Sequence, residues 1–220
     1  MSALILRYLF DPLCGWCYAS APTLARLAEE FPEELELCPT GLFSGKGARR
    51  LTREFATHAR TNDRRIAFMT GQRFSSDYFE NILGVDGLSF DSTAMNLALT
   101  AVRSVAPQFE TKLLSRLQIV RYIDGLDTSR LDIVEQVVQE FLRNLGHTKE
   151  ANDFPQHLRR DPTLQTQTHI RISNANGALA RSEVSGVPLL LVEKGESIYP
   201  VSGASLYSDT DSLINQIRKI

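Results

Sequence analysis

Two cysteines, Cys14 and Cys17, lie two residues apart in the segment FDPLCGWCYASAP, which spans residues 10–22. The pair directly follows an apolar run at residues 3–10. Thiols at this spacing serve three kinds of chemistry: they bind a metal ion, form a structural disulfide, or exchange electrons with other thiols and disulfides. Each use requires different residues elsewhere in the chain.

A structural zinc site needs four ligands, of which this pair supplies two. The chain has no second pair of the same spacing. The four histidines stand too far apart in sequence to form the usual histidine pair; they are His58, His147, His157 and His169. A site completed by Cys38 and one distant histidine has no support in the spacing, so we expect no metal.

A purely structural disulfide is also a poor use of this pair, because it would close too short a loop to add much stability. The three cysteines are few and odd in number, unlike those of a disulfide-stapled secreted protein. The first residues, MSALILRYLFDP, lack the basic start and the cleavage site of a secretory signal. We therefore expect a cytoplasmic protein in which Cys14 and Cys17 form a redox pair.

The redox interpretation fits the predicted local structure. Residues 3–10 have the composition of a buried strand, and apolar residues recur with helical spacing from about 15 to 31. Cys14 lies where the strand meets the helix, and free backbone N–H groups there favour a thiolate. The thiolate is the attacking species, and Cys17, one turn later, can resolve a mixed disulfide. Trp16 either contacts the substrate or packs against a neighbouring loop.

The remaining elements predict an α/β protein. A second strand at 35–38 would pair in parallel with the first. A helical region follows, with helices expected near 62–70, 76–83, 92–105, 109–120 and 129–145, and a long polar helix at 162–182. Residues 189–201 form a predicted hairpin, and a last helix begins at Asp209 or Asp211. Pro22 lies within the first predicted helix and should kink it.

This order of elements resembles the thioredoxin fold. Three features carry the resemblance: the Cys-x-x-Cys pair, Pro22 five residues later, and Val187-Pro188 in the segment SGVPLLLV. The long helical region resembles the insertion of DsbA-like proteins, and CGWCY resembles their cytosolic, FrnE-like branch. The implied domains are a discontinuous thioredoxin-like domain at 1–45 and 183–220, an inserted helical domain at 46–162, and a connecting helix at 163–182.

The resemblance implies a thiol–disulfide oxidoreductase that acts on protein or peptide thiols and disulfides. In it, Val187-Pro188 would be a cis peptide facing the cysteines, with the Val187 backbone contacting an extended substrate. Base rates alone favour a trans bond, since about 5–6% of X-Pro bonds in folded proteins are cis. The cysteine pair itself carries the electrons, so no organic cofactor or metal is expected, and glutathione is a candidate co-substrate.

Two other functions stay open. The first is a glutathione-dependent transferase or isomerase, like the kappa-class transferases and the hydroxychromene carboxylate isomerases; these resemble one-nucleophile enzymes, so Cys17 weighs against this reading. The second is a non-catalytic binding module. The net charge of −2 favours neither nucleic acid nor an anionic membrane as partner. The arginine-rich segment 49–65 is interpreted as a solvated helix face, or as a basic rim for an anionic substrate, and Cys38 as a bystander.

Overall fold

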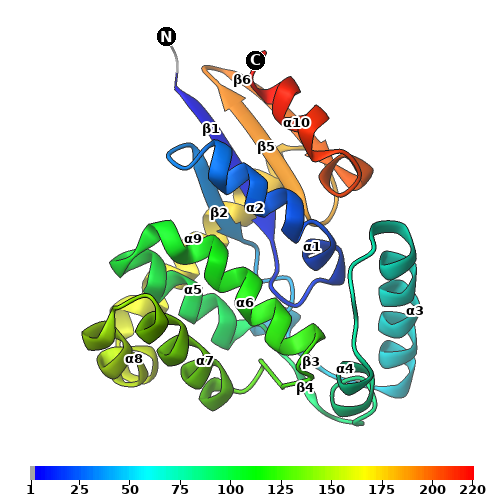
Figure 1. Cartoon of the computed structure of the whole chain (residues 1–220), viewed down its shortest axis with the longest axis vertical. Helices are drawn as coiled ribbons and strands as arrows, with labels where there is room; N and C mark the ends of the chain where they lie inside the picture. Colours follow the sequence, from blue (N-terminus) through cyan, green and yellow to red (C-terminus); the bar gives the residue numbers. More distant parts are fainter. Residues whose placement is uncertain (1–2) are drawn as a thin grey trace.

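The computed structural model describes residues 3–220. A four-stranded sheet forms its upper part in Figure 1, with strand order β2-β1-β5-β6. The first two strands pair in parallel, and the last two add antiparallel neighbours. The strands are β1 (Leu4–Phe10), β2 (Leu35–Pro39), β5 (Leu189–Lys194) and β6 (Ser197–Ser202). The sheet therefore joins the two ends of the chain, as predicted.

Helices supply most of the remaining structure. The early and late ones are α1 (Gly15–Ala19), α2 (Ala21–Glu30) and α10 (Thr210–Ile217). Those between β2 and β5 are α3 (Arg53–Thr70), α4 (Ser76–Asn81), α5 (Thr93–Val105), α6 (Glu110–Tyr122), α7 (Leu131–Asn144), α8 (Thr148–Arg160) and α9 (Pro162–Arg181). A short antiparallel pair, β3 (Arg49–Arg50) and β4 (Ser89–Phe90), lies among them.

Successive side chains of β1 point to opposite faces of the sheet and so pack in two different layers. Leu6, Tyr8 and Phe10 belong to the large core, which also contains residues of α2 and α10. Leu9 faces the opposite side, where it packs with Leu189, Leu191 and Ala178 of α9. The sheet is thus covered on both faces, and the helical region continues the large core below it (Figure 1).

Two predicted helices differ from the observed ones, and one observed helix was not predicted. The predicted helix at 15–31 is broken at Ser20, and Pro22 lies in the first turn of α2, where its missing N–H costs no hydrogen bond. The helix expected near 62–70 begins at Arg53 instead. Helix α8, which holds Pro155 within it, was not predicted. No helix in residues 3–220 is long and apolar enough to cross a membrane.

Candidate active site

The cysteine pair lies at the junction between β1 and α1, as predicted. Cys14 is the N-cap residue of α1, and Cys17 lies inside this helix. The backbone N–H of Cys14 donates to the Asp11 carbonyl (3.0 Å), which closes the intervening turn. Cys14 keeps 9% of its surface exposed and Cys17 keeps 1%, and neither forms a disulfide. Only the first thiol can therefore meet a large partner without movement of the chain.

The Val187-Pro188 segment faces this pair from the far end of the sequence. Its peptide bond is cis, as predicted. The Cys14 thiol lies 3.7 Å from the Val187 carbonyl oxygen, to which it donates a weak hydrogen bond. Pro188 is buried, whereas Val187 is half-buried. The loop before β5 therefore forms a wall directly against the more exposed thiol.

A pocket of about 280 Å³ opens beside this wall. It is lined by Trp16, Val184, Ser185, Gly186, Val187, Pro188, Ser202, Gly203 and Tyr207. The rings of Trp16 and Tyr207 lie 5.4 Å apart, and the Arg65 guanidinium lies 5.8 Å from the centre of the Trp16 ring. Trp16 thus packs against a neighbouring loop and also lines the pocket, while its contact with a substrate stays a prediction.

The thiols of Cys17 and Cys38 are shielded from solvent. Burial is the main cause that raises the pKa of Cys17 well above its ordinary value, and the neighbouring Cys14 thiol adds to the shift. Burial likewise raises the pKa of Cys38 to about 12. Both groups are therefore protonated at neutral pH, which suits Cys17 to act after another thiol and leaves Cys38 unreactive.

Asp11 positions the loop that carries the cysteines, a role that the sequence did not reveal. Its buried carboxylate accepts hydrogen bonds from the Leu13 N–H (2.9 Å), the Phe43 N–H (3.1 Å) and the Ser92 hydroxyl (2.8 Å). Burial raises the Asp11 pKa, and the three donors oppose that rise. One side chain therefore ties the β1–α1 turn to the loop after β2 and to the start of α5.

A second buried carboxyl, Asp63 of α3, lies directly behind the pair. A Cβ placed on Gly15 would lie 2.6 Å from Asp63 Oδ1 and 3.1 Å from Ile66 Cδ1, so a larger residue at position 15 would force these side chains of α3 to move. The Tyr78 hydroxyl donates to Asp63 Oδ2 (2.9 Å). Burial raises the Asp63 pKa to about 7, against the opposing effects of Tyr78 and Arg121.

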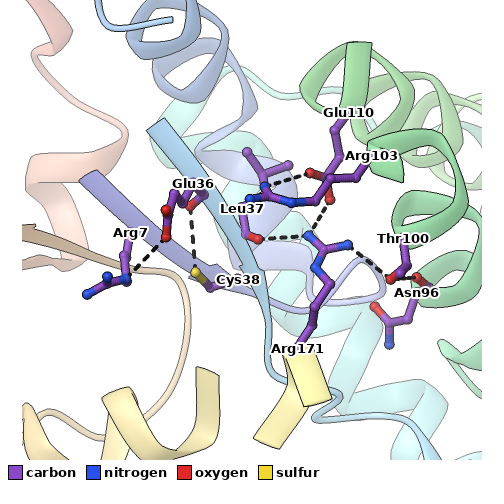
Figure 2. A network of polar contacts seen from close by, with 9 residues as sticks. All are labelled: Arg7, Glu36, Leu37, Cys38, Asn96, Thr100, Arg103, Glu110 and Arg171. Carbon is purple, nitrogen blue, oxygen red and sulfur yellow. Dashed lines mark hydrogen bonds and ion pairs between the residues drawn. The ribbon is translucent and has the colours of Figure 1, made fainter. Parts of the chain in front are cut away.

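Cys38 lies away from the pair, on the β2 face that α9 covers (Figure 2). It lines a hollow of about 460 Å³ together with Arg7, Arg103, Arg171 and Arg181. Most of this positive charge is already paired. Arg7 binds Glu36 and Glu193, while Arg103 and Arg171 both bind Glu110. The geometry gives Cys38 no contact with Cys14 or Cys17.

The arginines of segment 49–65 are exposed except for the half-buried Arg60. Several stack on aromatic rings: Arg49 lies over Phe43 and Phe55, and Arg60 over Phe79. Only Arg65 reaches the aromatic residues beside the cysteine pair. In the part of the chain that the structure describes, no three His, Cys, Asp or Glu side chains cluster closely enough to hold a metal ion.

Solved structures match the chain over nearly its whole length. The cytosolic disulfide reductase DsbM from Pseudomonas aeruginosa aligns with a TM-score of 0.81 and 22% identity, covering 98% of this chain and 97% of DsbM. Its structure with GSH gives 0.79, again with 22% identity and 98% of both chains covered. A candidate protein disulfide isomerase from Nitrosomonas europaea gives 0.73 and 21%, with 98% and 96% covered. This chain has a DsbA-like thioredoxin fold.

A candidate DsbA oxidoreductase from Streptomyces coelicolor shares the DsbA-like fold at a TM-score of 0.65 and 14% identity, with 99% of this chain and 91% of that chain covered. No family model and no curated protein matches the sequence. The fold class predicted from the sequence is confirmed. In this DsbA-like fold, the long helical region lies between β2 and β5, and the cysteine pair faces the cis peptide across the sheet end.

Proposed function

We propose that this protein is a thiol–disulfide oxidoreductase in which Cys14 is the nucleophile and Cys17 the resolving cysteine. The single observation that carries this proposal is the 3.7 Å contact between the Cys14 thiol and the Val187 carbonyl, with Cys17 buried behind it. An extended substrate that pairs with the Val187 backbone would place its own sulfur next to Cys14.

In the reductive direction, the Cys14 thiolate attacks one sulfur of a substrate disulfide. The substrate S–S bond breaks, a Cys14–substrate disulfide forms, and the leaving substrate thiolate takes up a proton. Cys17 then loses its proton and attacks the Cys14 sulfur, which releases the second substrate thiol and leaves a Cys14–Cys17 disulfide. Two electrons have passed to the substrate, and a thiol reductant must return them.

We propose glutathione as that reductant, and the cytoplasm as the place of action. The support is the fold of DsbM, a protein described as a cytosolic disulfide reductase and solved with GSH. Trp16, Val187 and Pro188 would contact the substrate, because all three line the pocket beside Cys14. No resident cofactor or metal takes part in this scheme.

Cysteine variants test the proposal. Reduction of a small disulfide substrate by glutathione should be lost in Cys14→Ser. In Cys17→Ser it should stall as a mixed disulfide, detectable as a mass increase on the protein. Cys38→Ser is the matched control and should keep full activity, because Cys38 lies on another face of the sheet. Full activity in the Cys14→Ser/Cys17→Ser double variant would refute the proposal.

The same variants separate this function from a one-nucleophile glutathione transferase or isomerase. Such an enzyme would keep its turnover in Cys17→Ser and lose it in Cys14→Ser. Cys17 weighs against this alternative, because its thiol lies within one helical turn of Cys14, which adds to the rise in the Cys17 pKa that burial causes. A binding module would show no thiol exchange in any variant.

A further inference from the structure

Positive charge is concentrated in one segment of the chain, which runs from the loop after β2 to the residues just past α3. Residues 46–73 contain eight of the 24 Lys and Arg residues of the chain but two of its 26 Asp and Glu residues. One of these two acids, Asp63, is buried against α1. The exposed surface of the segment is therefore basic, although the whole chain has a net charge of −2. Charge concentrated in this way attracts partners of the opposite sign.

The last turns of α3 carry exposed apolar side chains beside this charge. Helix α3 packs against α1 at the edge of the molecule (Figure 1), and its other side faces solvent. On the solvent side, Phe68 is 92% exposed and Met69 is 49% exposed. Arg64 lies four residues before Phe68, and Arg65 lies four before Met69, so these side chains are neighbours on the helix surface. We call these four residues the α3 patch.

The two arginines of the α3 patch are available to a partner. Both side chains are exposed. Whereas Arg7, Arg103 and Arg171 bind carboxylates, neither Arg64 nor Arg65 forms an ion pair within residues 3–220. A single exposed apolar residue is common on protein surfaces. Two of them beside two such arginines fit a partner that combines apolar and acidic side chains.

Arg65 joins the α3 patch to the cysteine pair. Its guanidinium lies 5.8 Å from the centre of the Trp16 ring. Trp16 follows Cys14 by two residues and lines the pocket beside the Val187-Pro188 wall. A polypeptide bound on the α3 patch can therefore continue across Trp16 to the Cys14 thiol.

We propose that the α3 patch binds the segment next to the reactive disulfide of a polypeptide substrate, and that it selects segments combining Asp or Glu with apolar residues. This inference deepens the proposed function and rests on it. Arg64 and Arg65 attract the carboxylates, while Phe68 and Met69 supply apolar contact area. The patch lies outside the pocket beside Cys14, whose lining residues do not belong to α3, so its occupant is the polypeptide and not glutathione.

Binding is tested with three ten-residue peptides in which serine replaces the reactive cysteine, so that no thiol exchange occurs. They share two leucines and differ at three positions, which hold Asp, Asn or Lys. Calorimetry should show that the parent protein binds the Asp peptide about tenfold more tightly than the Asn peptide at 20 mM salt. At 300 mM salt the preference should fall below about twofold, because surface ion pairs are screened. The Lys peptide should bind most weakly.

Variants of the α3 patch separate its charge from its apolar surface. Arg64→Gln/Arg65→Gln should abolish the preference for the Asp peptide. Phe68→Ser should weaken binding of the Asp and Asn peptides alike, by about fivefold, and keep the preference. A parent protein without preference for the Asp peptide would overturn the inference, and so would tighter binding of a ten-nucleotide single-stranded DNA than of the Asp peptide.

Arg50→Gln/Arg53→Gln is the matched control. It removes the same two charges from exposed positions of the same basic segment, at the far end of α3 from the patch. The preference for the Asp peptide should change by less than about twofold, since these positions lie more than a Debye length from the patch. An equal loss in both double variants would show that overall charge attracts the peptide, and would overturn the inference.

Turnover distinguishes the polypeptide from glutathione. The Asp peptide is made with its cysteine and oxidised to a disulfide-linked dimer, which the protein reduces with glutathione. Arg64→Gln/Arg65→Gln should raise the KM for this disulfide by about tenfold, and the KM for glutathione by much less. An equal rise in both KM values would identify a binding surface for glutathione and contradict the inference.

The two proposals fail in different ways. If the parent protein binds the Asp peptide selectively but reduces no disulfide, the proposed function fails and the α3 patch stands as a binding surface. If it reduces disulfides without selective binding of the Asp peptide, the proposed function stands and the inference fails.

Discussion

At the scale of single residues, two buried acids shape the site, and neither could be recognised in the sequence. Asp11 precedes a proline and looks like a turn residue, yet its carboxylate joins three separate segments. Asp63 lies in an arginine-rich segment and looks like one charge on a solvated helix face. Its importance comes from contact with Gly15, 48 positions earlier, which no local pattern encodes.

The Asp63 carboxyl should also make stability depend on pH. Its folded pKa of about 7 exceeds its ordinary value of 3.8, so between these values the folded state holds a proton that the unfolded state has lost. Stability must then fall as the pH rises from about 4 to 7, by up to about 4 kcal/mol. Asp63→Asn should remove this decrease.

Urea unfolding at a series of pH values measures the effect. At pH 4 the two proteins should have similar free energies of unfolding, and at pH 8 the Asn variant should be the more stable. Parallel curves for the parent and the variant across this range would contradict the prediction.

At the scale of elements, the sequence predicted the helices and strands that can be recognised from the pattern of apolar residues within their own segment. The strands of the sheet, the hairpin and the last helix are amphipathic or continuously apolar, and each lies where its pattern indicates. The extent of α3 was missed because most of the helix is exposed and its contact with α1 involves few side chains, among them Asp63 and Ile66. Helix α8 was missed because Pro155 and many polar residues interrupt its pattern.

The packing of α1 against α3 predicts the effect of Gly15→Ala. Alanine is the better helix former by as much as about 1 kcal/mol, but its Cβ would lie 2.6 Å from Asp63 Oδ1. The steric cost should dominate, with a loss of about 1–3 kcal/mol in the free energy of unfolding. Chemical denaturation measures this loss. In the Asp63→Ala background the same substitution should cost much less; equal costs in both backgrounds would exclude direct contact.

Arg171 joins α9 to the helical region and the sheet, as Figure 2 shows. It donates to Thr100 Oγ1 (3.0 Å), the Leu37 carbonyl (2.9 Å) and the buried Glu110. Arg171→Met should lower the free energy of unfolding by about 3 kcal/mol, because Glu110 keeps only Arg103 as counter-charge. Arg181→Met, at the exposed end of the same helix, should cost less than about 0.5 kcal/mol in the same denaturation experiment. Similar losses in both variants would contradict this assignment.

At the scale of the whole molecule, the predicted division into domains stays a proposal about chain order. It distinguishes a thioredoxin-like domain (1–45 and 183–220), an inserted domain (46–162) and a connecting helix (163–182). One hydrophobic cluster runs from β1 through α5, α6 and α7 to α10. Layers that share such a core should not unfold separately.

We therefore expect one cooperative unfolding transition. Trp16, the single tryptophan, reports on the end of the sheet that carries the cysteine pair, whereas far-ultraviolet circular dichroism reports mainly on the helices. The two signals should give the same midpoint and slope in urea. A Trp16 transition that precedes the loss of helix would show that the sheet and the insertion are independent units.

Cys14 and Val187 are separated by 173 positions in the sequence, and this separation affects the order in which the site forms during synthesis of the chain. The ribosome releases β1 and the cysteine pair early, whereas β5, which β1 needs as its antiparallel neighbour, emerges only near the end. At about 5–20 residues per second, this delay lasts roughly 9 to 35 seconds. During that interval the nascent chain carries its two thiols without the opposing loop, so the contact between Cys14 and Val187 can form only when translation is almost complete.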